Sequence, residues 1–215
     1  MKLGAIITGD IIHSTQLTME DRVYMIEQLE HLPQILNSVD KVTFEIFRGD
    51  SFQISISKAR SALRCALATR AWLRSHRMES TNQVLDARIA LGVGTLDYQS
   101  DSLSTSDGEA YRLSGRTLDN MTKSRLEVRT PWHDVNEELK LLTAFADDIV
   151  SSWSQNQSKI ILMSLVENKS HVELSQELKI SRQMVDKSLK ASKEELIEAY
   201  IHRYEHLLNN HLQSQ

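Results

Sequence analysis

Residues 41–57 read KVTFEIFRGDSFQISIS, and this stretch decides the fold of the first half of the chain. Apolar residues alternate with polar ones along both of its halves: Val42, Phe44 and Ile46, then Phe52, Ile54 and Ile56. A period of two is typical of strands that bury one face, and Gly49-Asp50 between the halves is a turn signal. The stretch therefore predicts a β-hairpin.

Other elements flank the hairpin on both sides. Apolar spacing of three and four predicts helices at 17–37, 58–76 and 108–122, and apolar runs predict strands at 2–8, 85–92 and 126–128. Pro33 is expected to kink the first helix or end it early. This order predicts an α+β fold, a ferredoxin-like or palm-type antiparallel sheet with helices on one face.

The chain after Pro131 is predicted to be helical. A long amphipathic helix at about 134–154 precedes a polar linker at 155–158, and further helices follow. We therefore expect a palm domain at 1–130, a connector helix and linker at 131–157, and an all-α helix-turn-helix domain at 158–215.

Composition limits the classes of function. The 215 residues carry a formal net charge of −4, so a nucleic-acid site has to come from local clustering of basic residues. The single cysteine excludes a disulfide framework within the chain. The longest apolar runs are too short to cross a membrane, and Asp10 interrupts the first one, so we expect a cytoplasmic protein without a membrane partner.

The segment ELSQELKISRQMVDKSLK at 173–190 carries the strongest motif of the second half. Ser170 and Glu173 have the spacing of a capping box, and Ser181 fits the N-cap of a second helix. The segment resembles the helix-turn-helix of LuxR-type regulators and of the promoter-reading end of sigma factors. It departs from their pattern most at Ser175, in place of alanine, and at Lys179, in place of the glycine of the turn.

Charge in this segment favours DNA as the partner. Residues 179–193 hold five basic side chains against one acidic one, a net of +4. The residues that we expect at bases and phosphates are Lys179, Ser181, Arg182, Gln183, Lys187 and Lys190. A three-helix bundle with a solvated or protein-docking face is the alternative. The last helix, 192–212, has an apolar stripe too wide for one small domain, so we expect a homodimer or packing on the front domain.

Two aspartates of the front half are predicted to converge. Asp10 directly follows the first strand, and Asp50 lies at the tip of the hairpin. Paired carboxylates at strand ends bind Mg²⁺ or Mn²⁺, and such ions can hold a triphosphate and activate a hydroxyl. Aspartates that only cap turns are the alternative.

These motifs resemble class III nucleotide cyclases in reduced form. The matching stretches are Asp10 to Thr15, Gly49-Asp50, Arg88 to Gly92 and Gly108 to Arg116. A closer resemblance is to the SatD family of bacterial proteins, on GDII-x-S, RGDSFQ, IALGVG and GEAYRLSGRTLD, and it covers most of residues 1–120.

The cyclase resemblance implies roles for individual residues. Asp10, the Ile11 backbone and Asp50 match the metal ligands, and Ile11, Ile12, His13 and Ser14 match the turn that cradles a triphosphate. Arg116 matches the transition-state arginine, and Arg112 stands where a ribose-positioning asparagine belongs. Ile46 and Thr105 replace the residues that read the base, so the resemblance implies phosphate binding without base recognition.

Three hypotheses follow from the sequence. The first is a DNA-binding transcriptional regulator whose front domain binds a nucleotide or phosphate ligand with a divalent metal. The second is a diverged nucleotide cyclase or phosphotransferase that uses Asp10 and Asp50 as metal ligands and Arg116 as a catalytic group. The third is a scaffold that binds only protein at both ends. The loss of base-reading residues favours a sensor over an enzyme.

Overall fold

The hairpin forms as predicted in the computed structural model, which describes residues 3–100, 102–167 and 169–213. Strands β2 (Val42–Phe47) and β3 (Ser51–Ile56) pair antiparallel, with Val42 opposite Ile56 and Phe47 opposite Ser51. Arg48 and Gly49 between them both have positive φ, 56° and 79°. A positive φ costs glycine little, so Gly49 allows the tight turn that places Asp50 at the strand end.

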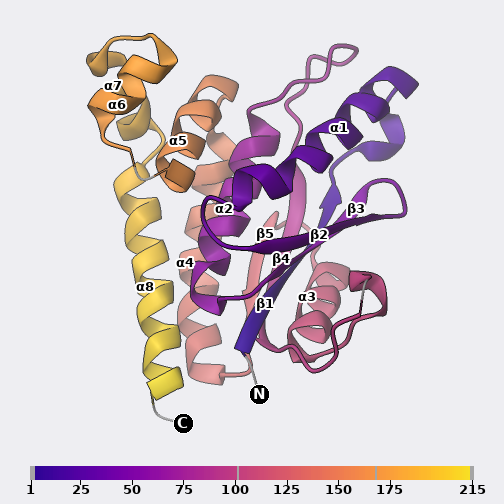
Figure 1. The fold of residues 1–215 in the computed structure, drawn as a ribbon. Coiled ribbons are helices and arrows are strands. Elements are labelled where there is room, and N and C mark those ends of the chain that lie inside the picture. Colours follow the sequence, from indigo (N-terminus) through magenta and orange to yellow (C-terminus); the bar gives the residue numbers. More distant parts are fainter. Residues whose placement is uncertain (1–2, 101, 168, 214–215) are drawn as a thin grey trace.

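The sheet has five strands in the order β2-β3-β1-β4-β5 (Figure 1). Strand β1 (Leu3–Ile11) lies at its centre, antiparallel to β3 and to β4 (Ala87–Thr95). Strand β5 (Leu126–Arg129) is parallel to β4, so the prediction of a purely antiparallel sheet was wrong. The helix between β4 and β5 returns the chain to the end of the sheet at which β4 begins, and a crossover of this kind makes the two strands parallel. The first residue of the predicted strand 2–8, Lys2, lies outside the described residues.

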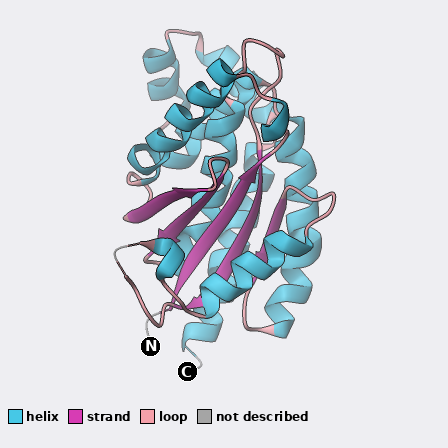
Figure 2. Ribbon diagram, turned by 90° about the vertical axis from the view of Figure 1, so that its right-hand side faces the viewer, coloured by secondary structure: helices cyan, strands magenta, loops and turns pink. Residues whose placement is uncertain are grey.

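Helices cover both faces of the sheet, which corrects the prediction of helices on one face (Figure 2). Helix α3 (Glu109–Asn120) packs on β4 and β1, where a Cβ atom built on Gly92 would lie 2.4 Å from the Ala110 carbonyl oxygen. Helices α1 (Met19–Leu36), α2 (Ala62–Arg74) and α4 (His133–Ser152) lie on the opposite side. The unbroken apolar run of β1 is explained by burial on both faces.

Two helix boundaries differ from the predictions. Helix α1 continues through Pro33 and ends at Leu36. The predicted polar linker at 155–158 is the first turn of α5 (Gln155–Glu167), and the chain breaks instead at Trp153 and Ser154. Trp153 is buried, and its indole donates a hydrogen bond to the carbonyl oxygen of Ser192 at 2.9 Å. That anchor fixes the turn without a flexible segment.

The last three helices are α6 (His171–Leu178), α7 (Arg182–Ala191) and α8 (Glu194–Gln213). The Ser170–Glu173 capping box and the Ser181 N-cap both form as predicted. One apolar cluster continues from the sheet through α2 and α4 into α5 and α8, so the back helices pack directly on the front half. The three domain limits stay a prediction. Within the described residues, no helix has the length and apolarity needed to cross a membrane.

Candidate functional site

Asp10 and Asp50 meet where the ends of β1 and β3 adjoin. Asp10 is the ladder partner of Ser51, and the Ser51 hydroxyl lies 3.4 Å from Asp10 Oδ1 and 3.4 Å from Asp50 Oδ1. The backbone nitrogen of Ile11 donates to the carbonyl oxygen of Asp50 at 3.0 Å. The predicted convergence of two carboxylates is therefore present, and both side chains are partly open to solvent.

The loop after β1 is fixed from both sides. The Ser14 hydroxyl donates to Asp50 Oδ2 at 2.5 Å, and the backbone nitrogen of Ile12 donates to the carbonyl oxygen of Asp86 at 3.0 Å. Arg22 holds the carbonyl oxygen of Ser14 at 3.2 Å, and His13 has φ 61° in the left-handed region. A non-glycine residue with this backbone is uncommon and marks a tightly determined turn.

Arg88 of β4 is a member of the site to which the sequence analysis gave no role. Its guanidinium group lies 2.6 Å from Asp10 Oδ2 and also donates to the carbonyl oxygen of Met121 beyond α3. The sequence could have indicated this role, because Arg88 lies at the start of the predicted strand 85–92, two residues after Asp86, and that strand pairs with β1. Its charge compensates one carboxylate and gives the site a cation that could contact a phosphate.

The residues present fit a divalent cation that a ligand helps to hold. Among the described residues, no group of three or more His, Cys, Asp or Glu side chains could hold a metal ion. Mg²⁺ is commonly bound by one or two carboxylates, with water and substrate phosphates completing its shell. Asp10 and Asp50 supply two such carboxylates, whose oxygens now accept hydrogen bonds from Ser14, Ser51 and Arg88.

The two arginines of α3 lie away from the aspartates. Arg112 pairs with Asp107 at 2.7 Å and with Asp97 at 3.7 Å, beyond the end of β4. Thr95 at that end is opposite Leu3, so Arg112 is at the other end of β1 from Asp10. Arg116 is exposed, and none of the interactions of the described residues joins it to Asp10 or Asp50. The structure thus brings together the predicted metal ligands and loop, but neither arginine.

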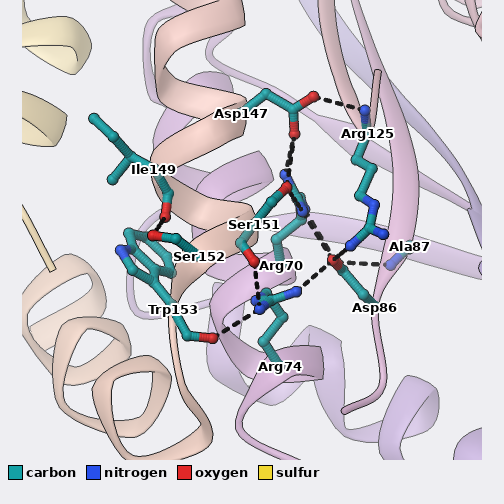
Figure 3. Close-up of polar contacts among 10 residues, drawn as sticks. All are labelled: Arg70, Arg74, Asp86, Ala87, Arg125, Asp147, Ile149, Ser151, Ser152 and Trp153. Carbon is teal, nitrogen blue, oxygen red and sulfur yellow. Dashed lines mark hydrogen bonds and ion pairs between the residues drawn. The ribbon is translucent and has the colours of Figure 1, made fainter. Parts of the chain in front are cut away.

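A buried ionic network lies beside this loop (Figure 3). Arg70 of α2 binds both oxygens of Asp86, at 3.1 and 2.8 Å, and Asp147 of α4 at 2.6 Å. Arg74 and Arg125 also donate to Asp86 Oδ2, at 2.7 and 3.1 Å. Burial alone would raise the pKa of Asp86, but the charges and hydrogen bonds of Arg70 and Arg74 outweigh it and hold that pKa below its usual value.

The residues predicted to bind DNA share one exposed surface. Lys179, Ser181, Arg182, Gln183, Lys187 and Lys190 are all exposed, while Leu174, Val185 and Leu189 are buried against α5. Arg182 forms a weak i,i+4 pair with Asp186 at 3.7 Å. Lys179 adopts φ 52° between α6 and α7, the left-handed conformation expected for the position that glycine takes in the resembled pattern. The basic side chains of α7 are thus open to solvent, and the helix-turn-helix itself stays a prediction.

Comparison with known proteins yields distant similarity of fold. The sequence matches no protein-family model and no curated protein. The structure is similar to the catalytic core of a rhodopsin-guanylyl cyclase in complex with ATPalphaS, with 14% identity, 59% of this chain and 77% of that chain covered, and a TM-score of 0.46. It is similar to the monomeric guanylyl cyclase domain of the RhoGC fusion protein from the aquatic fungus Blastocladiella emersonii, with 13% identity, coverage of 59% and 80%, and a TM-score of 0.46. The active GGEEF domain of a diguanylate cyclase from Vibrio cholerae gives 18% identity, coverage of 61% and 85%, and a TM-score of 0.42.

Proposed function

We propose that the chain is a DNA-binding transcriptional regulator that senses a nucleotide-like phosphate ligand together with Mg²⁺ or Mn²⁺. The observation that carries the ligand half is the pair Asp10 and Asp50, which share Ser51 beside a loop fixed on both sides. The present partners of these carboxylate oxygens are two hydroxyl groups and one arginine, which a metal that also binds phosphate could replace.

Calorimetry tests the ligand half. ATP and GTP, titrated with Mn²⁺ or with EDTA, are expected to bind only with the metal, and Asp10→Asn and Asp50→Asn should abolish that binding. Asp134→Asn is the matched control, because the Asp134 side chain is 74% exposed and contacts His211 of α8. Equal binding in EDTA, or by the Asp10→Asn protein, would contradict the proposal. The Asp10–Arg88 pair is partly exposed, so its loss should cost at most about 1 kcal/mol of folding stability.

The DNA half rests on the exposed basic face of α7. Lys187 and Lys190 would neutralise phosphates, and each such contact gives a slope of about −0.9 in a plot of log affinity against log salt concentration. Anisotropy with a random duplex should show steep salt dependence, reduced in Lys187→Ala and Lys190→Ala and unchanged in Lys41→Ala, whose lysine is also exposed. Absence of binding at low salt would remove DNA as the partner.

A homodimer would present two such helices to one duplex. The surface available for it is an apolar groove of about 580 Å³ between α4 and α8, lined by Leu142, Phe145, Ile149, Leu196, Ile197 and Tyr200. Phe145 is 62% exposed. Sedimentation should show a dimer that Phe145→Glu converts to a monomer, and a monomeric wild-type protein at micromolar concentration would refute this element.

A diverged nucleotide cyclase or phosphotransferase is the second candidate. Arg88 favours it, because a guanidinium group 2.6 Å from Asp10 could stabilise charge on a reacting phosphate. Incubation with ATP or GTP and Mn²⁺ separates the two candidates. Turnover that Asp10→Asn abolishes would favour the enzyme, and binding without turnover favours the sensor.

A further inference from the structure

We infer that a second pocket, on the α2 side of the loop after β1, binds a phosphate dianion, free or as a small monoester, without a metal. The pocket has a volume of about 390 Å³, and its principal lining residues are Ile12, His13, Arg74, Arg77, Asp86 and Arg125. These residues come from the loop, the end of α2, the approach to β4 and the approach to β5. We call it the basic pocket. It requires neither Asp10 nor Asp50 and so does not rest on the metal site proposed above.

The charges around the basic pocket do not cancel. Three arginines line the pocket, Arg74, Arg77 and Arg125, and Asp86 is the one acidic residue of the lining, which leaves 3 − 1 = +2. Asp86 Oδ2 alone accepts from three guanidinium groups of the ionic network, at 2.8, 2.7 and 3.1 Å. A cleft lined by an excess of positive charge attracts anions from solution.

The excess charge lies on the accessible side. The Arg125 side chain is 38% exposed, and Arg77 is exposed and donates to the oxygens of Asn82. Arg77 also lines a neighbouring pocket together with Asp21 and Glu79, so part of its charge is compensated there and Arg125 carries the larger share of the excess. Arg77 and Arg125 are therefore the guanidinium groups that a ligand can reach from solvent, and Arg125 would share itself between the ligand and Asp86.

A buried donor in the wall of the pocket lacks an acceptor. Arg74 is 7% exposed, its terminal nitrogens bind Asp86 and the carbonyl oxygens of Ser151 and Trp153, and its Nε atom has no hydrogen-bond partner. A buried unsatisfied donor destabilises the protein that contains it. The Nε atom is closed to solvent, so a phosphate oxygen would reach it only after a shift of the Arg74 side chain. The more accessible guanidinium groups of Arg77 and Arg125 can bind phosphate in planar, two-point geometry.

The volume of the pocket limits the range of ligands that it can hold. Pockets for small molecules span about 300 to 1,000 Å³, so this one is near the lower limit. It would admit a phosphate group with a small organic substituent. A phosphate bound here would lie next to Ile12, whose amide is already tied to the Asp86 carbonyl oxygen.

Calorimetry in EDTA at low salt, with inorganic phosphate and with glycerol phosphate as probes, tests the proposal. Both probes should bind, and Arg77→Gln and Arg125→Gln should each weaken binding by about tenfold or more, the usual effect of losing one charged hydrogen bond. Binding of inorganic phosphate alone would restrict the ligand to the free ion. Arg60→Gln, at an exposed arginine that does not line the pocket, is the matched control and should bind as the wild type does.

Asp10→Asn distinguishes the two sites, because it should remove metal-dependent nucleotide binding and leave phosphate binding in EDTA intact. No phosphate binding at millimolar concentration would overturn the proposal. Binding that Arg77→Gln and Arg125→Gln leave unchanged, or that Asp10→Asn abolishes, would overturn it as well.

Discussion

Asp86→Asn tests the ionic network directly. The substitution keeps the shape of the side chain and one carbonyl oxygen, but it removes the charge that three guanidinium groups share. Arg70 is fully buried and would keep Asp147 as a counter-charge, and Arg74 would lose the one carboxylate that it contacts among the described residues. Removing one partner from a buried ion pair costs about 3–5 kcal/mol, and we expect a loss of that size here.

Urea unfolding at pH 7, followed by circular dichroism, measures the change in the free energy of unfolding. Asp147→Asn is the matched comparison, since Asp147 is 13% exposed and pairs with one arginine, so it should cost less than Asp86→Asn. A loss below about 1 kcal/mol for Asp86→Asn would refute the reasoning, because exposed pairs already reach that value.

The same residue predicts an acid dependence. The folded-state pKa of Asp86 lies below its usual value of 3.8, so its stabilisation is present above that value and is lost as the pH falls through the folded pKa. The acid-induced loss of stability should be shallower in Asp86→Asn than in the wild type.

Three further predictions concern other parts of the chain. Lys179→Gly should raise the free energy of unfolding in urea by about 0.5–1 kcal/mol, because glycine adopts the φ of 52° without strain. The same variant should bind DNA more weakly, because it lacks one positive charge. A destabilised variant would show that the lysine side chain contributes more than its backbone conformation costs. Tyr204→Phe should cost about 1–3 kcal/mol by the same assay, since the buried hydroxyl donates to the Ala59 carbonyl oxygen at 2.7 Å; an unchanged midpoint would mean that this bond adds nothing. Burial lowers the pKa of His76 below 6.5, so the free energy of unfolding should fall as the pH drops from about 6.5 toward the folded pKa. In His76→Gln this part of the dependence of stability on pH should be absent. An equal dependence on pH in both proteins would contradict the lowered pKa.

The sequence predicted the elements whose signals are local. The hairpin was found because alternation is complete within its two strands, and the capping box at Ser170 was found because its partners are three residues apart. The convergence of Asp10 and Asp50 could be predicted once β1 was placed beside the hairpin. The two covered faces of the sheet were missed, although the unbroken run of β1 carries the signal of a strand buried on both sides.

The ionic network could not be predicted because its partners are far apart in the chain. Arg70 lies 16 residues from Asp86 and 77 residues from Asp147. An arginine within a helix is ordinarily exposed, and only the packing of α4 against α2 places Asp147 above it. The apolar residues around Arg70 in ALATRAWL mark a buried helix position, but they do not identify the partner that neutralises the charge.

The network also connects the basic pocket to the back helices. Arg74 binds Asp86 at the basic pocket and the carbonyl oxygen of Trp153 at 2.7 Å, and the Trp153 indole binds the carbonyl oxygen of Ser192 at the end of α7. The contacts between the pocket and the basic helix are therefore continuous. Continuity alone transmits nothing, because a ligand shifts an equilibrium only by its difference in affinity for two arrangements. A regulator built on this chain needs two positions of α7, and Arg74 and Trp153 are the residues whose contacts would have to differ between them.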